Sequence, residues 1–290
     1  MPWLEIHINT NREDAPLIED QLMEVGALSV TLQDNADQPI FEPALGETPL
    51  WSETRVTGLF EAEVDTSTID SQLQLPTKAN FKWHIVEDKD WEREWMQHYN
   101  PIQCGDNFWI CPSWIAPPNP EAVNLLLDPG LAFGTGTHPT TFLCLQWLAT
   151  QALTDKDIID YGCGSGILGI GAILLGAKQV LGVDIDPQAL LATQDNAQRN
   201  AIAAERFPVV FPDKCSNSPV DVMVANILAG PLVELAPTLT PLVKPGGKLC
   251  LSGILATQAE AVQAAYAPFF DFDPVAKKEE WVRLTATKHA

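Results

Sequence analysis

The sequence predicts a doubly wound α/β domain preceded by a smaller α+β domain, and three observations support this. From Ile102 onward, short apolar strand segments alternate with helical segments, which is typical of a mostly parallel sheet. A glycine-rich turn at 162–166 joins one of these strands to the next helix. Residues 1–87 instead show segments in the order β-α-β-β-α-β. We therefore predict domains at 1–87 and 101–290, joined by a linker helix at 88–100.

The N-terminal domain is predicted from alternation and helical spacing. Residues 3–9 alternate polar and apolar side chains, as a half-buried strand does. Asn11 suits the N-cap of a helix that Gly26 ends. The order of the segments matches a ferredoxin-like split unit. The remaining segments are strands at 28–33, 55–64 and 81–86 and a short helix at 66–75.

The linker differs from both domains. Trp91, Trp95 and Tyr99 recur every four residues with charged side chains between them, which predicts one amphipathic helix. We interpret this aromatic stripe as a packing face rather than a ligand site.

The segments predicted after the linker are short strands that alternate with helices. The predicted strands are 108–111, 124–127, 157–161, 179–184, 207–211, 220–225, 247–253 and one near the C-terminus. The predicted helices are 139–151, 166–175, 187–201 and 230–243.

The chain is strongly acidic, with 38 acidic and 17 basic side chains. Residues 1–87 carry 16 acids and 4 bases, so the N-terminal domain is the more acidic part. Such a field repels phosphate backbones and anionic lipid and attracts cationic partners. The alternative is that the charge only keeps the protein soluble, and composition alone does not separate the two.

The six cysteines are scattered, without a CxxC pair or a histidine cluster, so we expect reduced thiols and no metal site. The N-terminus lacks a basic start and an apolar core, and no apolar stretch approaches about 18 residues. We therefore expect a cytoplasmic protein with no membrane segment.

The glycine-rich turn carries the strongest chemical signal. Gly162, Gly164 and Gly166 alternate along the turn and let the backbone pass close to a ligand. The turn also matches the dinucleotide fingerprint GxGxxG, which is a weak signal alone. Asp160, two residues earlier, would oppose an anionic pyrophosphate but would suit the sulfonium and ammonium groups of S-adenosylmethionine. This favours a methyltransferase over a nicotinamide-dependent oxidoreductase.

Two polar residues follow later strands at the same predicted edge. Asp184 can accept both ribose hydroxyls of an adenosine cofactor, or it can cap the next helix, although Asp186 suits that cap better. Asn226 can accept a hydrogen bond from an amine and aim its lone pair at a methyl donor, or it can cap a helix. The Gly- and Thr-rich segment 128–141 can hold a carboxylate at a helix N-terminus.

Together, segment 128–141, the turn at 160–166, Asp184 and the triplet Asn226-Ile227-Leu228 resemble the PrmA family, the methyltransferases of the eleventh large-subunit ribosomal protein. The resemblance spans 101–290, and the N-terminal domain agrees in size and predicted topology. It implies a Rossmann-like domain that binds S-adenosylmethionine and methylates lysine ε-amines and the N-terminal α-amine of that basic protein. It also implies that the N-terminal domain grips the substrate.

For the site residues, the resemblance implies cofactor contacts by Thr141, Gly162, Asp184 and Asn226. It places His138 and Phe133 beside the reacting amine and Trp281 over the site. His138 can act as a base or only as a hydrogen-bonding group, and both roles stay open.

Three other functions compete. A nucleic-acid methyltransferase would follow Asn226 with Pro-Pro-aromatic to stack a flipped base, whereas Ile227 and Leu228 follow it here. The oxidoreductase is disfavoured by Asp160. The N-terminal domain could also be a small-molecule regulatory module. We expect a monomer with no direct nucleic-acid or membrane partner.

Overall fold

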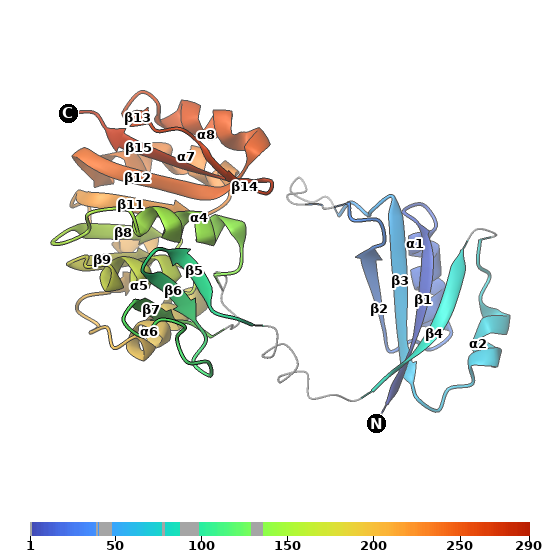
Figure 1. Cartoon of the computed structure of the whole chain (residues 1–290). Helices are drawn as coiled ribbons and strands as arrows, with labels where there is room; N and C mark the ends of the chain where they lie inside the picture. The colour runs from blue at the N-terminus through green and yellow to red at the C-terminus, as the bar shows by residue number, and fades with distance from the viewer. Residues whose placement is uncertain (1, 39, 41–47, 77–78, 88–98, 129–135) are drawn as a thin grey trace. The chain divides into compact units, whose positions relative to one another are not determined.

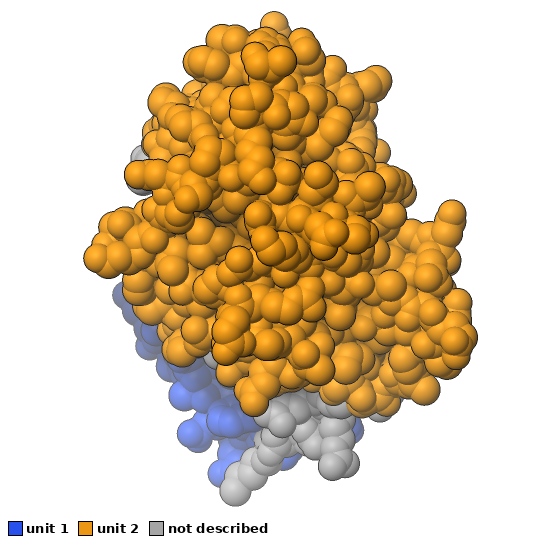
Figure 2. Space-filling model, turned by 90° about the vertical axis from the view of Figure 1, so that its left-hand side faces the viewer, with its two compact units in different colours: residues 1–96 blue, residues 97–290 orange. Residues whose placement is uncertain are grey.

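A computed structural model of the chain describes residues 2–38, 40, 48–76, 79–87, 99–128 and 136–290. The chain divides into two compact units, residues 1–96 and 97–290, which Figure 2 colours separately. The predicted linker helix lies outside the described residues apart from its last two. No described helix combines the length and the apolar character that a bilayer crossing requires.

The N-terminal unit contains one four-stranded antiparallel sheet in the order β2-β3-β1-β4. The chain order of its elements, β-α-β-β-α-β, agrees with the predicted ferredoxin-like arrangement. The elements are β1 (Trp3–Asn11), α1 (Ala15–Glu24), β2 (Ser29–Asp34), β3 (Glu53–Glu61), α2 (Thr66–Gln72) and β4 (Asn80–Val86).

The entry into α1 differs from the prediction. Asn11 is the last residue of β1, and its Oδ1 accepts hydrogen bonds from the backbone N–H groups of Glu13 and Asp14. Asp14 is the N-cap residue instead. Asn11 therefore shapes the turn that precedes the helix rather than capping it, because short polar side chains compete for nearby backbone donors. Gly26, with a φ of +97°, follows the helix as predicted.

The C-terminal unit is built on a large sheet in the order β10-β9-β8-β11-β12-β15-β13, with β14 paired to β15 (Figure 1). The pairs from β10 to β12 are parallel, and β15 runs antiparallel to β12. The strands are β8 (Asp157–Tyr161), β9 (Gln179–Val183), β10 (Val209–Val210), β11 (Val220–Asn226), β12 (Val243–Leu255), β13 (Phe270–Phe272), β14 (Ala276–Lys278) and β15 (Trp281–Lys288).

A three-stranded sheet, β5-β6-β7, precedes the large sheet in the chain. Its strands are β5 (Ile102–Gly105), β6 (Phe108–Cys111) and β7 (Val123–Leu126), of which the last two match predicted segments. The described helices of this unit are α4 (Pro139–Leu148), α5 (Ile167–Leu174), α6 (Pro187–Arg199), α7 (Ala229–Leu239) and α8 (Ala259–Tyr266).

Alternate residues of the central strands supply two separate cores. Ile158 and Val222 pack with α4 and α5, whereas their neighbours Ile159 and Met223 pack with α7 and α8. Successive strand side chains point to opposite faces, so both faces of the sheet are covered. The predicted doubly wound α/β class is therefore confirmed.

Prolines explain two boundaries that the prediction missed. The strand predicted at 207–211 is reduced to two residues, because Pro208 and Pro212 flank them and cannot donate to a ladder. The helix predicted to reach residue 243 ends at Leu239 and becomes a short 3₁₀ turn that contains Pro241.

A buried hydrogen bond joins α8 to α7 on one face of the sheet. The fully buried Tyr266 donates from Oη to the carbonyl oxygen of Leu232 at 2.8 Å. We expect Tyr266→Phe to lower the free energy of unfolding by about 1 kcal/mol, because the side chain keeps its packing and loses only this bond. Urea denaturation, with circular dichroism as the check on fold, measures the change. An unchanged unfolding midpoint would mean that the bond contributes nothing.

Candidate functional site

The glycine turn lies at the carboxyl end of β8, where the strand order changes direction between β8 and β11. Ligands of open α/β sheets bind at such a switch point. The N–H of Gly162 donates to the carbonyl of Val183 at 2.7 Å, and the N–H of Gly166 donates to the carbonyl of Cys163 at 2.7 Å. These bonds tie the turn to the end of β9 and close it on itself.

Only glycine fits at the positions that form the turn. Gly162, Gly164 and Gly166 have φ values of +77°, +54° and +79°, in the left-handed region. A Cβ on Gly162 would lie 2.2 Å from Cγ2 of Ile227, and a Cβ on Gly166 would lie 2.7 Å from Cγ2 of Thr193. The backbone of the turn is therefore packed closely against two other segments.

Two side chains of α6 donate hydrogen bonds to carbonyl oxygens of the glycine turn. Neither residue was predicted as part of the site from the sequence. Thr193 is fully buried and donates from Oγ1 to the carbonyl of Gly164 at 3.0 Å. Asn196 donates from Nδ2 to the carbonyl of Ser165 at 2.9 Å. The available signal was their three-residue spacing, which puts two polar side chains on one face of the predicted helix.

Asp184 lies directly after β9 and faces the glycine turn. Its Oδ2 accepts a hydrogen bond from the N–H of Gly164 at 2.9 Å, and its Oδ1 accepts one from the N–H of Asp186 at 3.0 Å. Asp186 caps α6 by accepting from the N–H of Gln188. The helix-cap interpretation of Asp184 is therefore wrong. A carboxylate oxygen can accept more than one hydrogen bond, so Asp184 retains capacity for a ligand hydroxyl.

Asp160 lies beneath the turn and is 1% exposed. Its Oδ2 accepts from the N–H of Gly169 at 2.9 Å, and its Oδ1 has no partner among the described residues. Burial and, to a lesser extent, the charge of Asp184 raise the pKa of Asp160 to about 7, against the opposing effect of the hydrogen bond from Gly169. The Asp160 side chain thus accepts a hydrogen bond from the first turn of α5, the helix that follows the glycine turn.

The third glycine of the dinucleotide fingerprint has a packing role. A Cβ on Gly169 would lie 2.2 Å from Cζ of Phe207, so this glycine lets α5 approach the chain before β10. This close packing of α5 against the chain before β10 does not depend on which cofactor is bound, so the GxGxxG match does not identify the cofactor.

Asn226, the last residue of β11, meets Thr141 of α4 at the same edge. Its Nδ2 donates to Oγ1 of Thr141 at 3.4 Å. Its Oδ1 is buried and finds no hydrogen-bond partner within the described part of the chain. The helix-cap interpretation of Asn226 is wrong, because Leu228 is the N-cap residue of α7. The structure thus brings an unsatisfied acceptor to the switch point.

A glycine that the prediction overlooked fixes the segment after Asn226. Gly253 has a φ of +82°, and a Cβ there would lie 2.2 Å from the carbonyl oxygen of Ile227. Ile227 is therefore held between Gly162 and Gly253. The signal in the sequence was a glycine close to the end of a predicted strand, which often marks a close backbone approach.

His138 and Trp281 meet at the start of α4. The Nδ1 of His138 accepts from the N–H of Thr140 at 3.3 Å, so this histidine is the N-cap residue of α4. Its ring centroid lies 4.8 Å from that of Trp281 in an edge-to-face arrangement. Burial lowers the pKa of His138, although the charge of Glu279 partly opposes this shift.

The segment 128–141 is described only at its two ends. Asp128 accepts hydrogen bonds from the N–H and Oγ of Ser113 and lies 3.5 Å from Nη1 of Arg199. Phe133 lies outside the described residues. At the other end, Gly136 has a φ of +86° and a Cβ there would lie 2.7 Å from Cδ1 of Ile110.

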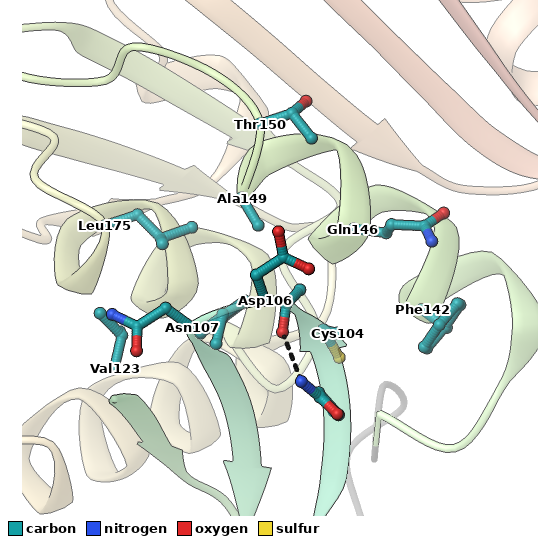
Figure 3. A pocket seen from close by; sticks show the side chains of 12 residues that line it. Cys104, Asp106, Asn107, Val123, Phe142, Gln146, Ala149, Thr150 and Leu175 are labelled. Atoms are coloured by element: carbon teal, nitrogen blue, oxygen red, sulfur yellow. Dashed lines mark hydrogen bonds between the residues drawn. The ribbon is translucent and has the colours of Figure 1, made fainter. Parts of the chain in front are cut away.

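A pocket of about 590 Å³ lies elsewhere on the C-terminal unit. It is formed by the turn between β5 and β6 together with the outer side of α4. Figure 3 shows the Asp106 carboxylate pointing into it, between Phe142 and Leu175. No predicted site residue within the described ranges lines this pocket, so it is separate from the switch-point site.

The buried carboxyl group makes folding stability depend on pH. The pKa of Asp160 is raised in the folded state, so its contribution to stability is complete below about pH 4 and is lost as pH rises through about 7. We expect Asp160→Asn, which retains the acceptor for Gly169, to lose less stability than the wild type as pH rises from about 4 to about 7. Thermal unfolding at several pH values measures this difference.

Asp157→Asn is the matched control, because it makes the same charge change at the partly exposed start of β8. Its stability profile should follow that of the wild type. Parallel profiles for wild type and Asp160→Asn would contradict a raised pKa at Asp160.

Comparison with known proteins places the chain in a family. A model of the family described as "Ribosomal protein L11 methyltransferase (PrmA)" matches residues 2–289. Relatives of that name from Teredinibacter turnerae and Pseudomonas aeruginosa are 66% and 57% identical, with the whole of this chain covered and 98% and 100% of theirs. The crystal structure of a ribosomal protein L11 methylase from Lactobacillus delbrueckii subsp. bulgaricus, 31% identical, covers 66% of this chain and 100% of its own with a TM-score of 0.59. The chain belongs to the ribosomal protein L11 methyltransferase family.

Proposed function

We propose that this chain transfers methyl groups from S-adenosylmethionine to lysine ε-amines and the N-terminal α-amine of ribosomal protein L11. The single observation that carries the proposal is the unsatisfied Oδ1 of Asn226 at the switch point of the sheet. A buried acceptor without a partner is costly, and an incoming amine N–H would satisfy it. Family membership over nearly the whole chain supports the same substrate.

The residues of the site fit an S-adenosylmethionine molecule. Gly162, Gly164 and Gly166 adopt positive φ values at the switch point and carry no side chain, so the backbone of the turn can lie against an adenosine moiety. Asp184 accepts a hydrogen bond from the N–H of Gly164 and keeps acceptor capacity for the ribose hydroxyls of the adenosine. When bound, S-adenosylmethionine supplies an electrophilic methyl group on a sulfonium centre.

Asn226 and its neighbours act on the acceptor amine. The Oδ1 of Asn226 accepts an amine N–H and thereby aims the nitrogen lone pair into the crevice. Thr141 holds the other end of the amide by accepting from Nδ2. Because a sulfonium is a good leaving group, alignment of the nucleophile supplies most of the rate enhancement.

The amine must be neutral before it can react. A free lysine has a pKa of about 10.4, so roughly one in two thousand is neutral at pH 7. Removal of the amine from water beside a cationic centre lowers its pKa and favours the reactive form. His138 has Nδ1 engaged with Thr140, and burial lowers the pKa of its ring against the opposing charge of Glu279. We assign His138 a positioning role beside Trp281, with Phe133 as a further wall of the amine site.

We propose that the N-terminal unit binds the substrate protein. Residues 1–87 carry 16 acidic and 4 basic side chains, which complement a basic ribosomal protein. We place the reaction in the cytoplasm, where ribosomal proteins are made, with the enzyme as a monomer that makes no direct contact with nucleic acid or membrane. The six cysteines, all free thiols, are compatible with that compartment.

Asn226 and Asp184 should separate transfer from cofactor binding. We expect Asn226→Ala to lower kcat by about 100-fold, because the amine loses its alignment, while the Kd for S-adenosylmethionine changes by less than about threefold. Asp184→Ala should raise that Kd by about tenfold or more, because a charged acceptor is lost. Mass spectrometry of methylated L11 and calorimetry measure the two effects.

Calorimetry on the wild-type chain also tests the reaction class. Binding of NAD without binding of S-adenosylmethionine would refute the proposed function. Mass spectrometry of ribosomal proteins from cells with and without the enzyme would identify the target, since L11 should lose whole methylene units of mass.

Charge steering predicts a dependence on salt. We expect the KM for L11 to rise between about 50 and 200 mM salt, because screening weakens attraction between exposed charges. The Kd for S-adenosylmethionine serves as the internal control, since that ligand does not need the N-terminal unit. A KM that stays flat across this range would rule out steering by charge.

A further inference from the structure

A two-residue hairpin carries a pair of glutamates at the edge of the site. Lys278 of β14 pairs with Trp281 of β15, so Glu279 and Glu280 form the turn between the strands. Trp281 also pairs with Leu255, at the carboxyl end of β12. The turn therefore lies at the same edge of the sheet as the ends of β8, β9 and β11, and α4 packs against both of its strands (Figure 1).

Glu279 adopts a conformation that its residue type does not favour. Its φ is +57°, in the left-handed region. Two-residue hairpins normally place Gly, Asn or Asp at such a position, because larger L side chains are strained there. An observed strain of this kind at the edge of a site motivates a functional explanation for the residue that bears it.

The charge of Glu279 acts on the amine site. Its side chain is exposed, and its carboxylate opposes the burial that lowers the pKa of His138. The ring of His138 in turn contacts Trp281, two residues beyond Glu279. The neighbouring cation, Lys278, lies over the ring of Phe142 at 5.0 Å. Glu279 thus presents negative charge beside the two rings that border the proposed amine site.

We propose that Glu279 binds the ammonium form of the acceptor at the mouth of the site and so selects cationic primary amines. This inference rests on the proposed function. A carboxylate attracts an ammonium group directly, and the face of Trp281 adds a cation–π attraction for the same charge. The ammonium group gives one proton to solvent water at the exposed mouth before the neutral amine reaches Asn226, so Glu279 acts on capture of the substrate and Asn226 acts on transfer.

The test compares two neighbouring glutamates in the full-length chain. Glu279→Gln keeps the size of the side chain and its backbone strain but removes the charge. We expect it to raise the KM for purified L11 by about three- to tenfold, with kcat and the Kd for S-adenosylmethionine within about twofold of wild type. The matched control, Glu280→Gln, should keep the wild-type KM, because of the two glutamates only Glu279 acts on the pKa of His138.

Two further readouts separate charge from structure. The pKa of His138, followed by NMR, should fall in Glu279→Gln and stay unchanged in Glu280→Gln, because the Glu279 charge raises it. Glu279→Gly relieves the strain, so its Tm should rise by about 2–4 °C while its KM rises as in Glu279→Gln. A gain in stability together with a loss of substrate affinity is expected only if the strained residue serves binding.

The outcomes distinguish this inference from the proposed function. Wild-type chain that methylates L11, with Glu279→Gln indistinguishable from it in KM, would overturn the role of Glu279 alone. An equal rise of KM in both glutamine variants would also overturn it, since the effect would then come from general surface charge. Wild-type chain that fails to methylate L11 would overturn the proposed function and this inference with it.

Discussion

The contact of Ile227 with two glycines is the constraint on which the site depends. Ile227 directly follows Asn226, and its side chain and carbonyl fill the spaces that side chains on Gly162 and Gly253 would occupy. The glycine turn at 162–166, the segment that carries the Asn226 amide and the end of β12 are therefore packed closely against one another. Any displacement of the turn would move Asn226 with it, because close-packed interiors transmit small shifts.

Hydrogen bonds from the end of one strand and from one helix hold the glycine turn in place. Asp184, directly after β9, accepts from the N–H of Gly164, and Thr193 and Asn196 of α6 donate to carbonyl oxygens of the turn. These bonds pre-organise the turn for a ligand. In contrast, the buried oxygens of Asp160 and Asn226 that have no described partner lie beneath the turn and at the crevice.

Much of the architecture could be predicted from the sequence, because the signals were local. The apolar strands, the glycine turn and the N-cap at Asp186 each depend on residues a few positions apart. The placement of Asp184 and Asn226 at one edge of the sheet followed from the rule that carboxyl ends of parallel strands share an edge. The turn-shaping role of Asn11 was missed because a side chain that can cap a helix can equally bond a turn.

What could not be predicted depended on contacts between distant segments. The need for glycine at 253 arises from a carbonyl 26 residues earlier, and the support from α6 arises 29 residues after Gly164. The extent of burial of Asp160, and hence its raised pKa, follows from packing on both faces of β8. Periodicity along one strand does not reveal how deeply a single polar residue will lie.

The unsatisfied amide oxygen of Asn226 has an energetic consequence for the free protein. The amide oxygen finds no donor among the described residues, and an acceptor that is desolvated in this way costs on the order of 1–3 kcal/mol. An apolar residue of similar size at position 226 would raise the free energy of unfolding but would abolish the alignment of the amine. Selection for thermal stability and selection for catalytic turnover therefore favour different residues at position 226.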